Sequence, residues 1–187
     1  MIEALAPGHS GGRDVFIPYQ SDVAMRRLPI GNFILIGVTV VISWLVLQLV
    51  ETREGLDPFL LNGFAMPGLV GHMFAHAGII HLAGNMMFLW IFGNAVCSKV
   101  GNGWYIPVYL GLGLVAATTH VMFDGGLAIG ASGAVNGIVG MFLVWYPLNN
   151  VSMFYWVFFR LGTFRVSSMW VIALWFVFDI WGALRGS

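Results

Sequence analysis

The stretch Gly130-Ala131-Ser132-Gly133-Ala134-Val135-Asn136-Gly137 sets one serine between glycines at the start of an apolar segment. No charged residue follows before Pro147, so we expect a helix from about Ser132 to Tyr146. A hydroxyl at a helix N-terminus lies beside backbone N–H groups that lack intrahelical partners and can stabilise developing negative charge. Glycines spaced as Gly133 and Gly137 are also typical of close helix packing. Ser132 is therefore a candidate nucleophile, with a pure packing motif as the alternative.

The composition indicates an integral membrane protein. Of its 187 residues, 59% are hydrophobic and 9% are charged, whereas soluble domains carry about 25% charged residues. Lipid requires every backbone polar group to be satisfied internally, and no alternating barrel pattern occurs, so we expect an all-α polytopic bundle. The formal net charge is zero, and no basic cluster suggests a nucleic-acid partner. The single cysteine, Cys97, excludes an intrachain disulfide and a cysteine-based metal cluster.

The chain divides into a polar N-terminal arm, residues 1–27, and a membrane domain, residues 28–187. The arm has no early apolar region, so we expect the first span to act as its own insertion signal. An apolar but glycine-rich stretch, residues 58–78, is predicted to be an irregular loop embedded in the membrane. Residues 148–165, with the aromatic run 154–159, are predicted to be an interfacial connection. The five predicted spanning helices cover residues 28–50, 79–98, 104–123, 132–146 and 167–184.

The positive charges support this order of spans. With the N-terminus in the cytoplasm, the inner segments carry Arg13, Arg26, Arg27, Lys99, Arg160 and Arg165. The outer segments carry only Arg53 and Arg185, which agrees with the positive-inside rule. We therefore expect a cytoplasmic N-terminus in a bacterial plasma membrane, and Ser132 near the outer face.

His81 and Asn85 strengthen the case for Ser132. They are four residues apart, so they share one helix face near the outer membrane surface, at the depth of Ser132. Both can donate hydrogen bonds, and with the Ser132 backbone N–H they would form an oxyanion hole. The alternative is a structural hydrogen bond between the second and fourth helices.

Other polar residues favour structural roles. We expect His72 and His76 to form hydrogen bonds within the irregular loop, because no carboxylate lies between them as a metalloprotease motif requires. His120 is expected to be a packed polar residue, and Cys97 a small buried one. Asp179 is expected to be an interfacial carboxylate bonded to a neighbouring helix. No metal and no cofactor is expected.

Taken in order, these motifs resemble the rhomboid family of intramembrane serine proteases. The matching stretches are His72–His76 (HMFAH), His81–Asn85 (HLAGN) and Gly130–Gly137 (GASGAVNG). The resemblance covers about residues 15–184. It implies a rhomboid-like bundle with Ser132 as nucleophile, His81 and Asn85 assisting the oxyanion, and Gly130, Gly133, Gly137, His72 and His76 in supporting roles. It also implies single-span membrane proteins as substrates, cut in or near the lipid bilayer.

The sequence departs from the family pattern at two places. Cys97 stands where the family commonly has glutamate. The general-base histidine of the family lies on a sixth helix, in an Ala-His-x-x-Gly type motif that this chain does not contain, so the domain reads as C-terminally incomplete. We expect the glycine face at Gly133, Gly137 and Gly140 to lack a packing partner for the same reason.

Three functions remain open at this point. The first is a rhomboid-type protease whose histidine-bearing helix is encoded downstream. The second is a naturally short, catalytically inactive rhomboid-like protein that binds transmembrane helices. The third is an unrelated channel or transporter with histidines along a pore, although no matched broken-helix repeat is present in the two halves.

Overall fold

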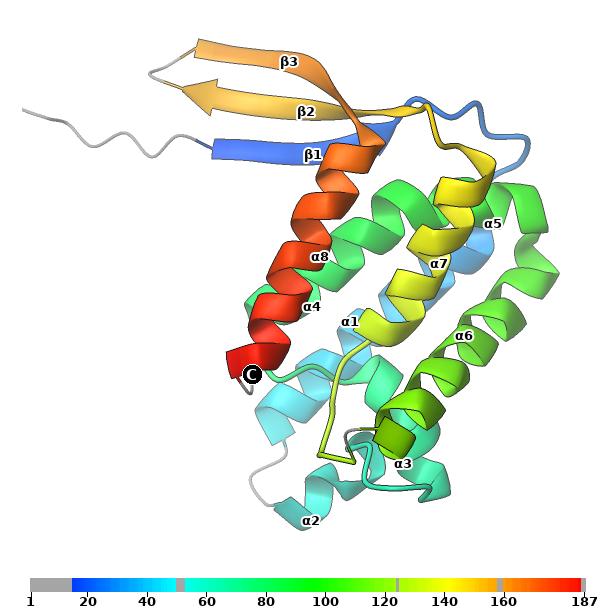
Figure 1. The fold of residues 1–187 in the computed structure, drawn as a ribbon, viewed down its shortest axis with the longest axis vertical. Coiled ribbons are helices and arrows are strands. Elements are labelled where there is room, and N and C mark those ends of the chain that lie inside the picture. The colour runs from blue at the N-terminus through cyan, green and yellow to red at the C-terminus, as the bar shows by residue number, and fades with distance from the viewer. Residues whose placement is uncertain (1–14, 50–52, 124, 158–159, 186–187) are drawn as a thin grey trace, which may run out of the picture.

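The computed structural model describes residues 15–49, 53–123, 125–157 and 160–185. A small sheet lies at one end of a bundle of helices, and short helices lie at the opposite end (Figure 1). The strands lie at the end where α1 and α6 begin, while α2 and α3 lie at the other end. The two ends of the bundle therefore differ in secondary structure, and α7, which begins at Ser132, starts away from the sheet.

Three helices in the described part are long and apolar enough to span a membrane. They are α1 (Ile30–Leu49), the continuous helix Ile79–Val100, and α6 (Asn102–Phe123). The second of these comprises α4 (Ile79–Phe88), a π-helical turn (Leu89–Gly93) and α5 (Asn94–Val100). The two remaining predicted spans form the apolar helices α7 (Ser132–Trp145) and α8 (Ser168–Arg185), which are shorter over the described residues. The helical bundle is thus as expected, and the count of five spans stays a prediction.

Short helical turns make up most of the segment between α1 and α4. They are α2 (Arg53–Leu56), a 3₁₀ turn (Asp57–Phe59), α3 (Met66–Gly71) and a second 3₁₀ turn (His72–Phe74). Residues 58–78 were predicted to be irregular, and none of these pieces exceeds six residues. Glycines and Pro67 keep the segment from forming one regular helix.

A three-stranded antiparallel sheet corrects the all-α prediction. Strands β1 (Val15–Ser21), β2 (Asn150–Val157) and β3 (Arg160–Ser167) lie in the order β1-β2-β3. Ile17 faces Phe154, and Phe154 faces Thr163 in the next strand. The predicted interfacial connection is therefore a hairpin, and it recruits part of the predicted arm. Valine, aromatic residues and threonine favour strands, and each of these three strands contains some of them.

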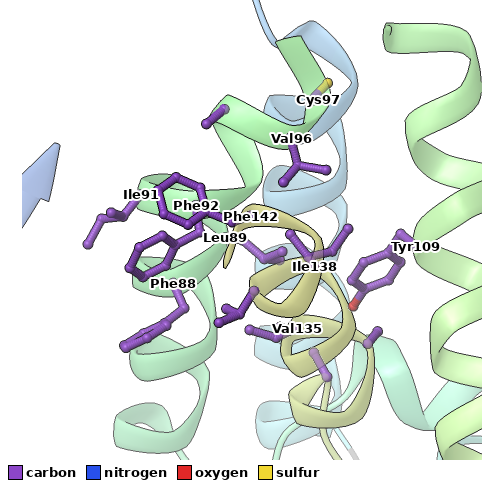
Figure 2. Packing of buried hydrophobic residues seen from close by; sticks show 14 of the residues in the cluster. Phe88, Leu89, Ile91, Phe92, Val96, Cys97, Tyr109, Val135, Ile138 and Phe142 are labelled. Carbon is purple, nitrogen blue, oxygen red and sulfur yellow. The ribbon is translucent and has the colours of Figure 1, made fainter. Parts of the chain in front are cut away.

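The core lies between α4–α5, α6 and α7, with α1 behind them (Figure 2). The rings of Phe92 and Phe142 meet edge to face, with centroids 4.8 Å apart. At the level of the π-helical turn, Asn32 donates hydrogen bonds to the Leu89 carbonyl and to Asn94 Oδ1, both at 2.8 Å, and accepts one from Tyr105 Oη at 2.7 Å. Buried polar groups are costly unless bonded, so Asn32 fixes α1 against two other helices. Cys97 is buried, as expected.

Candidate active site

Ser132 is the first residue of α7, directly after the N-cap residue Ala131. Within the described residues no side chain caps this helix N-terminus, and the first backbone N–H groups of a helix have no intrahelical partners. The Ser132 side chain is half-buried and lines a cavity of about 140 Å³ together with His72, His120 and Gly130. Ser132 therefore borders a space that a small reacting group can enter, at the positive end of a helix dipole.

The loop before Ser132 is fastened to the irregular segment. Leu61 and Ala128 exchange two backbone hydrogen bonds, at 2.8 and 3.2 Å. The Gly130 N–H donates to the His72 carbonyl at 2.9 Å. The irregular segment is thus part of the site, since it fixes the entry of the chain into α7.

His76 holds the residue next to Ser132. The Ala131 N–H donates to His76 Nε2 at 3.4 Å, and His76 Nδ1 lies 2.9 Å from Ser43 Oγ. Because Nε2 accepts from a backbone N–H, the ring proton is on Nδ1 and donates to Ser43, which in turn donates to the Phe74 carbonyl at 2.9 Å. His76 lies between the second 3₁₀ turn and α4, outside the spanning helices, and its burial lowers its pKa to about 3. A neutral ring is what this chain of hydrogen bonds requires.

We expect the neutral state of His76 to make stability depend on pH. An unfolded histidine takes up a proton below about pH 6.5, whereas the folded ring does so only near pH 3. Stability is therefore complete above pH 6.5 and declines as the pH falls toward 3, by about 2 kcal/mol at pH 5 from this residue. The measurement is thermal unfolding in detergent between pH 7.5 and 4.5. His76→Gln should start less stable but show a shallower decline; equal slopes for the two proteins would contradict the assignment.

His81 and Asn85 lie on α4, one turn apart. The His81 ring meets the His76 ring edge to face, with centroids 5.1 Å apart. A Cβ atom built on Gly130 would come within 2.7 Å of His81 Cε1, so the imidazole lies directly against the backbone two residues before Ser132. Asn85 is fully buried; its Nδ2 donates to the His81 carbonyl at 3.2 Å, and its Oδ1 has no partner among the described residues. An unpaired buried amide oxygen is rare, and the helix that carries it, α4, packs against α7.

Asn136 forms polar contacts between α7 and α8 that the sequence did not predict. It follows Ser132 by one helical turn, donates to Asp179 Oδ2 at 2.7 Å and accepts from Trp175 Nε1 at 2.8 Å. Asp179 is therefore bonded to a neighbouring helix, as expected. An amide in an otherwise apolar helix, four residues after Ser132, was the available signal. Through these bonds the position of α8 is tied to the helix that carries the serine.

The expectation that the glycine face of α7 lacks a partner is wrong for two of its three members. A Cβ on Gly133 would meet Ala116 of α6 at 2.6 Å, and one on Gly137 would meet Leu112 of α6 at 2.9 Å. Among the residues that the structure describes, none has an atom within 4 Å of such a Cβ on Gly140. α6 is thus the partner that these two glycines admit to close approach.

His72 and His120 line the serine's cavity but are each bonded to a carbonyl group. His72 Nδ1 donates to the Gly68 carbonyl at 2.8 Å, and His120 Nε2 donates to the Gly126 carbonyl at 2.9 Å. Within the described residues, no three histidine, cysteine, aspartate or glutamate side chains are grouped as a metal site would require. The cavity thus presents a hydroxyl, imidazoles and helix N–H groups.

These features define a helical integral membrane protein with a serine at a helix N-terminus inside the bundle. A family model described as Rhomboid domain matches residues 64–187, about two thirds of the chain, and the chain belongs to the rhomboid family. Homologues in this family are intramembrane serine proteases.

Three relatives show the extent of the similarity. Rhomboid protease GluP of Bacillus subtilis is 38% identical over 79 residues, which is 42% of this chain and 15% of that protein. Rhomboid protein 1, mitochondrial, of Saccharomyces cerevisiae is 26% identical over 93 residues, 46% of this chain and 27% of that protein. Rhomboid protease GlpG of Klebsiella pneumoniae is 27% identical over 116 residues, 59% of this chain and 38% of that protein. The chain thus matches well under half the length of each of these relatives.

Proposed function

We propose that this protein is an intramembrane serine endopeptidase that cleaves single-span membrane proteins near the outer face of the bilayer, with Ser132 as nucleophile. The observation that carries the proposal is the position of Ser132: it opens α7 inside a cavity, and the two residues before it are held by His76 and contacted by His81. A packing serine would need none of these arrangements. The names of the relatives support the same chemistry.

In the proposed reaction, Ser132 Oγ attacks the carbonyl carbon of the scissile peptide bond. The Oγ proton passes to a base, and the carbonyl π electrons move to the oxygen, which becomes an oxyanion. The Ser132 N–H, the His81 ring and the Asn85 amide are the proposed donors to that oxygen. Asn85 Nδ2 now donates to the His81 carbonyl, so this bond must be exchanged for one to the oxyanion. Collapse of the intermediate breaks the C–N bond, and the amine leaves with the proton from the base.

The proposed base is a histidine of a sixth helix, as the family pattern implies. His72 and His120 are the competing candidates, because they line the cavity with Ser132. Each donates one ring N–H to a carbonyl, so in a neutral ring the other nitrogen carries no proton. Substituting each by glutamine separates these two candidates from the proposal: loss of reactivity in either variant alone would assign the base to that residue.

The experiment is labelling of the purified protein, expressed from its complete reading frame, with a serine-directed fluorophosphonate. We expect labelling that Ser132→Ala abolishes and that Ser168→Ala preserves. Ser168 is the matched control, since it is a serine at the first position of a membrane helix, α8, but is fully buried. Absence of labelling in the unsubstituted protein would overturn the proposal and leave a helix-binding role.

Loss of the oxyanion donors is expected to slow turnover. His81→Ala or Asn85→Ala should each lower the cleavage rate of a single-span substrate roughly tenfold or more. The measurement is cleavage in proteoliposomes, with thermal unfolding recorded alongside to separate lost chemistry from lost folding. Unchanged turnover in both variants would return the pair to a structural role between α4 and its neighbours.

The charge distribution supports a proposed orientation. Arg26, Arg27, Lys99, Arg160 and Arg165 all belong to the end of the bundle that carries the sheet, and Ser132 belongs to the other end. By the positive-inside rule the sheet would face the cytoplasm, and the serine's cavity would open toward the outer face. A cysteine introduced at Thr163 should then be labelled by a membrane-impermeant reagent only in inverted vesicles.

A further inference from the structure

A groove of about 490 Å³ lies between β1, the loop that follows it, α1 and the π-helical turn of the second span. The groove is remote from Ser132 and shares no lining residue with the serine's cavity. Its walls are mainly apolar and include Tyr19, Met25, Leu28, Phe33, Trp90 and Ile91. The volume is in the range of sites that take an extended apolar ligand.

Two of these walls are rigid. The rings of Phe33 and Trp90 are stacked, with centroids 5.5 Å apart. Trp90 Nε1 also donates to the Tyr19 carbonyl at 3.1 Å, which ties the strand to the helix across the groove. A tryptophan fixed at both its face and its N–H cannot rotate to fill the space, so the groove is held open.

The start of the first candidate span would place the groove at the boundary between headgroups and acyl chains. Its residues Leu28 and Pro29 directly precede the span that begins at Ile30, and Phe33 is three residues inside it, about 5 Å deeper along the helix. Leu28 is 72% exposed, which is unfavourable in water and expected in contact with lipid. The deeper part of the groove therefore lies at the depth of lipid tails, and its mouth at the depth of headgroups.

Two arginines lie next to lining residues of the groove in the sequence, although neither lines it. Arg26 and Arg27 are exposed and stand between the lining residues Met25 and Leu28. The Arg27 backbone N–H donates to Ser98 Oγ at 3.1 Å, and Arg27 Nη1 would lie 3.1 Å from a Cβ on Gly101, so this guanidinium is fixed beside the loop between α5 and α6. In the same loop after β1, the carboxylate of Asp22 accepts three hydrogen bonds. They come from Asn149 Nδ2 and from the backbone N–H and Nδ2 of Asn150, at 2.7 to 3.1 Å.

We propose that this groove binds an anionic phospholipid of the leaflet that faces the sheet, with an acyl chain along Phe33 and Trp90 and the phosphate on Arg26 and Arg27. The charges select the headgroup and the apolar walls take the chain. A zwitterionic lipid places an ammonium group at the same arginines, so it binds more weakly. The bound lipid would brace β1 against the first two spans.

Native mass spectrometry of the detergent-purified protein, incubated with phosphatidylglycerol or with phosphatidylcholine, tests the proposal. We expect retained phosphatidylglycerol in excess over phosphatidylcholine, and a loss of roughly fivefold or more in R26Q/R27Q. The control, R160Q/R165Q, removes the same two charges from exposed positions of β3 and should bind within twofold of the unsubstituted protein. Equal losses in both double variants, or no preference between the two lipids, would overturn the proposal.

A second measurement uses the unsubstituted protein and so does not depend on the variants folding. A phosphatidylglycerol with a diazirine near the end of one acyl chain should crosslink to residues 25–33 and 90–94. Excess unlabelled phosphatidylglycerol should prevent this, whereas glycerol 3-phosphate should not, since it lacks the chain. Crosslinks spread evenly over α6 and α8 would show an ordinary lipid annulus and contradict a defined site.

Discussion

Gly130→Ala is expected to reduce the labelling rate of Ser132 at least a hundredfold. Gly130 has φ of +124°, a conformation that residues with a Cβ adopt only at a cost of about 1–3 kcal/mol. The added Cβ would also lie 2.7 Å from His81 Cε1 and 3.0 Å from His81 Nε2. The loop or the imidazole must move, and both adjoin Ser132. Displacement of reacting groups by about 1 Å costs on the order of a hundredfold in rate.

The control for this variant is Gly140→Ala. Gly140 lies on the same helix as Ser132, and its Cβ would have no neighbour within 4 Å in the described part of the chain. The fluorophosphonate labelling rate of Gly130→Ala should be at least a hundredfold below that of Gly140→Ala. Thermal unfolding of both variants shows whether the fold itself is retained. A Gly130→Ala protein that labels as fast as Gly140→Ala would show that the contact between His81 and the Gly130 loop has no part in reactivity.

Gly68→Ala is expected to destabilise the fold by about 3 kcal/mol or more. Gly68 and Gly71 of α3 pack on the segment that precedes it, and a Cβ at either would overlap a backbone carbonyl oxygen, of Leu60 and Pro58 respectively. Backbone atoms cannot rotate away as a side-chain tip can, so α3 itself must shift. The Gly68 carbonyl accepts the hydrogen bond from His72, and the His72 carbonyl accepts the one from Gly130. The shift should therefore reach the serine's cavity.

Thermal unfolding in detergent measures this effect, with Gly78→Ala as its control. Gly78 lies in the same segment before α4 and has nothing within 4 Å of its Cβ position, and its φ of −175° is ordinary extended backbone. Gly78 is the N-cap residue of α4, so we expect Gly78→Ala to cost at most about 1 kcal/mol, well below the effect of Gly68→Ala. Equal unfolding temperatures for the Gly68 and Gly78 variants would refute the tight packing of α3.

The helical bundle could be predicted from the sequence because its signals are local. Long uncharged stretches such as 104–123 indicate membrane-spanning helices. The spacing of His81 and Asn85 places both on one helix face, because residues four apart are one turn apart. Family membership followed from short motifs in a fixed order, and the match over residues 64–187 confirms it. The roles of Ser132, His81 and Asn85 remain proposals.

The sheet could not be predicted because its strands give weak local signals and their partners are distant. β1 contains Pro18, which lowers the expectation of a strand, and it has a register irregularity between Pro18 and Gln20. The aromatic residues of β2 read equally well as membrane-interface residues. Only the pairing of Ile17 with Phe154 resolves the ambiguity. Asn136 was missed for a similar reason, since its partners Trp175 and Asp179 lie about forty residues away.

The pairing of β1 with β2 also sets an order for biosynthesis. Residues 17 and 154 face each other in the finished sheet, yet at about 5–20 residues per second the ribosome needs on the order of ten seconds to make the chain between them. During that time Phe16, Ile17 and Tyr19 have no strand to pair with, and an uncovered apolar edge invites wrong partners. The sheet can close only after α7 has been synthesised, so its closure marks the completion of the bundle from α1 to α7.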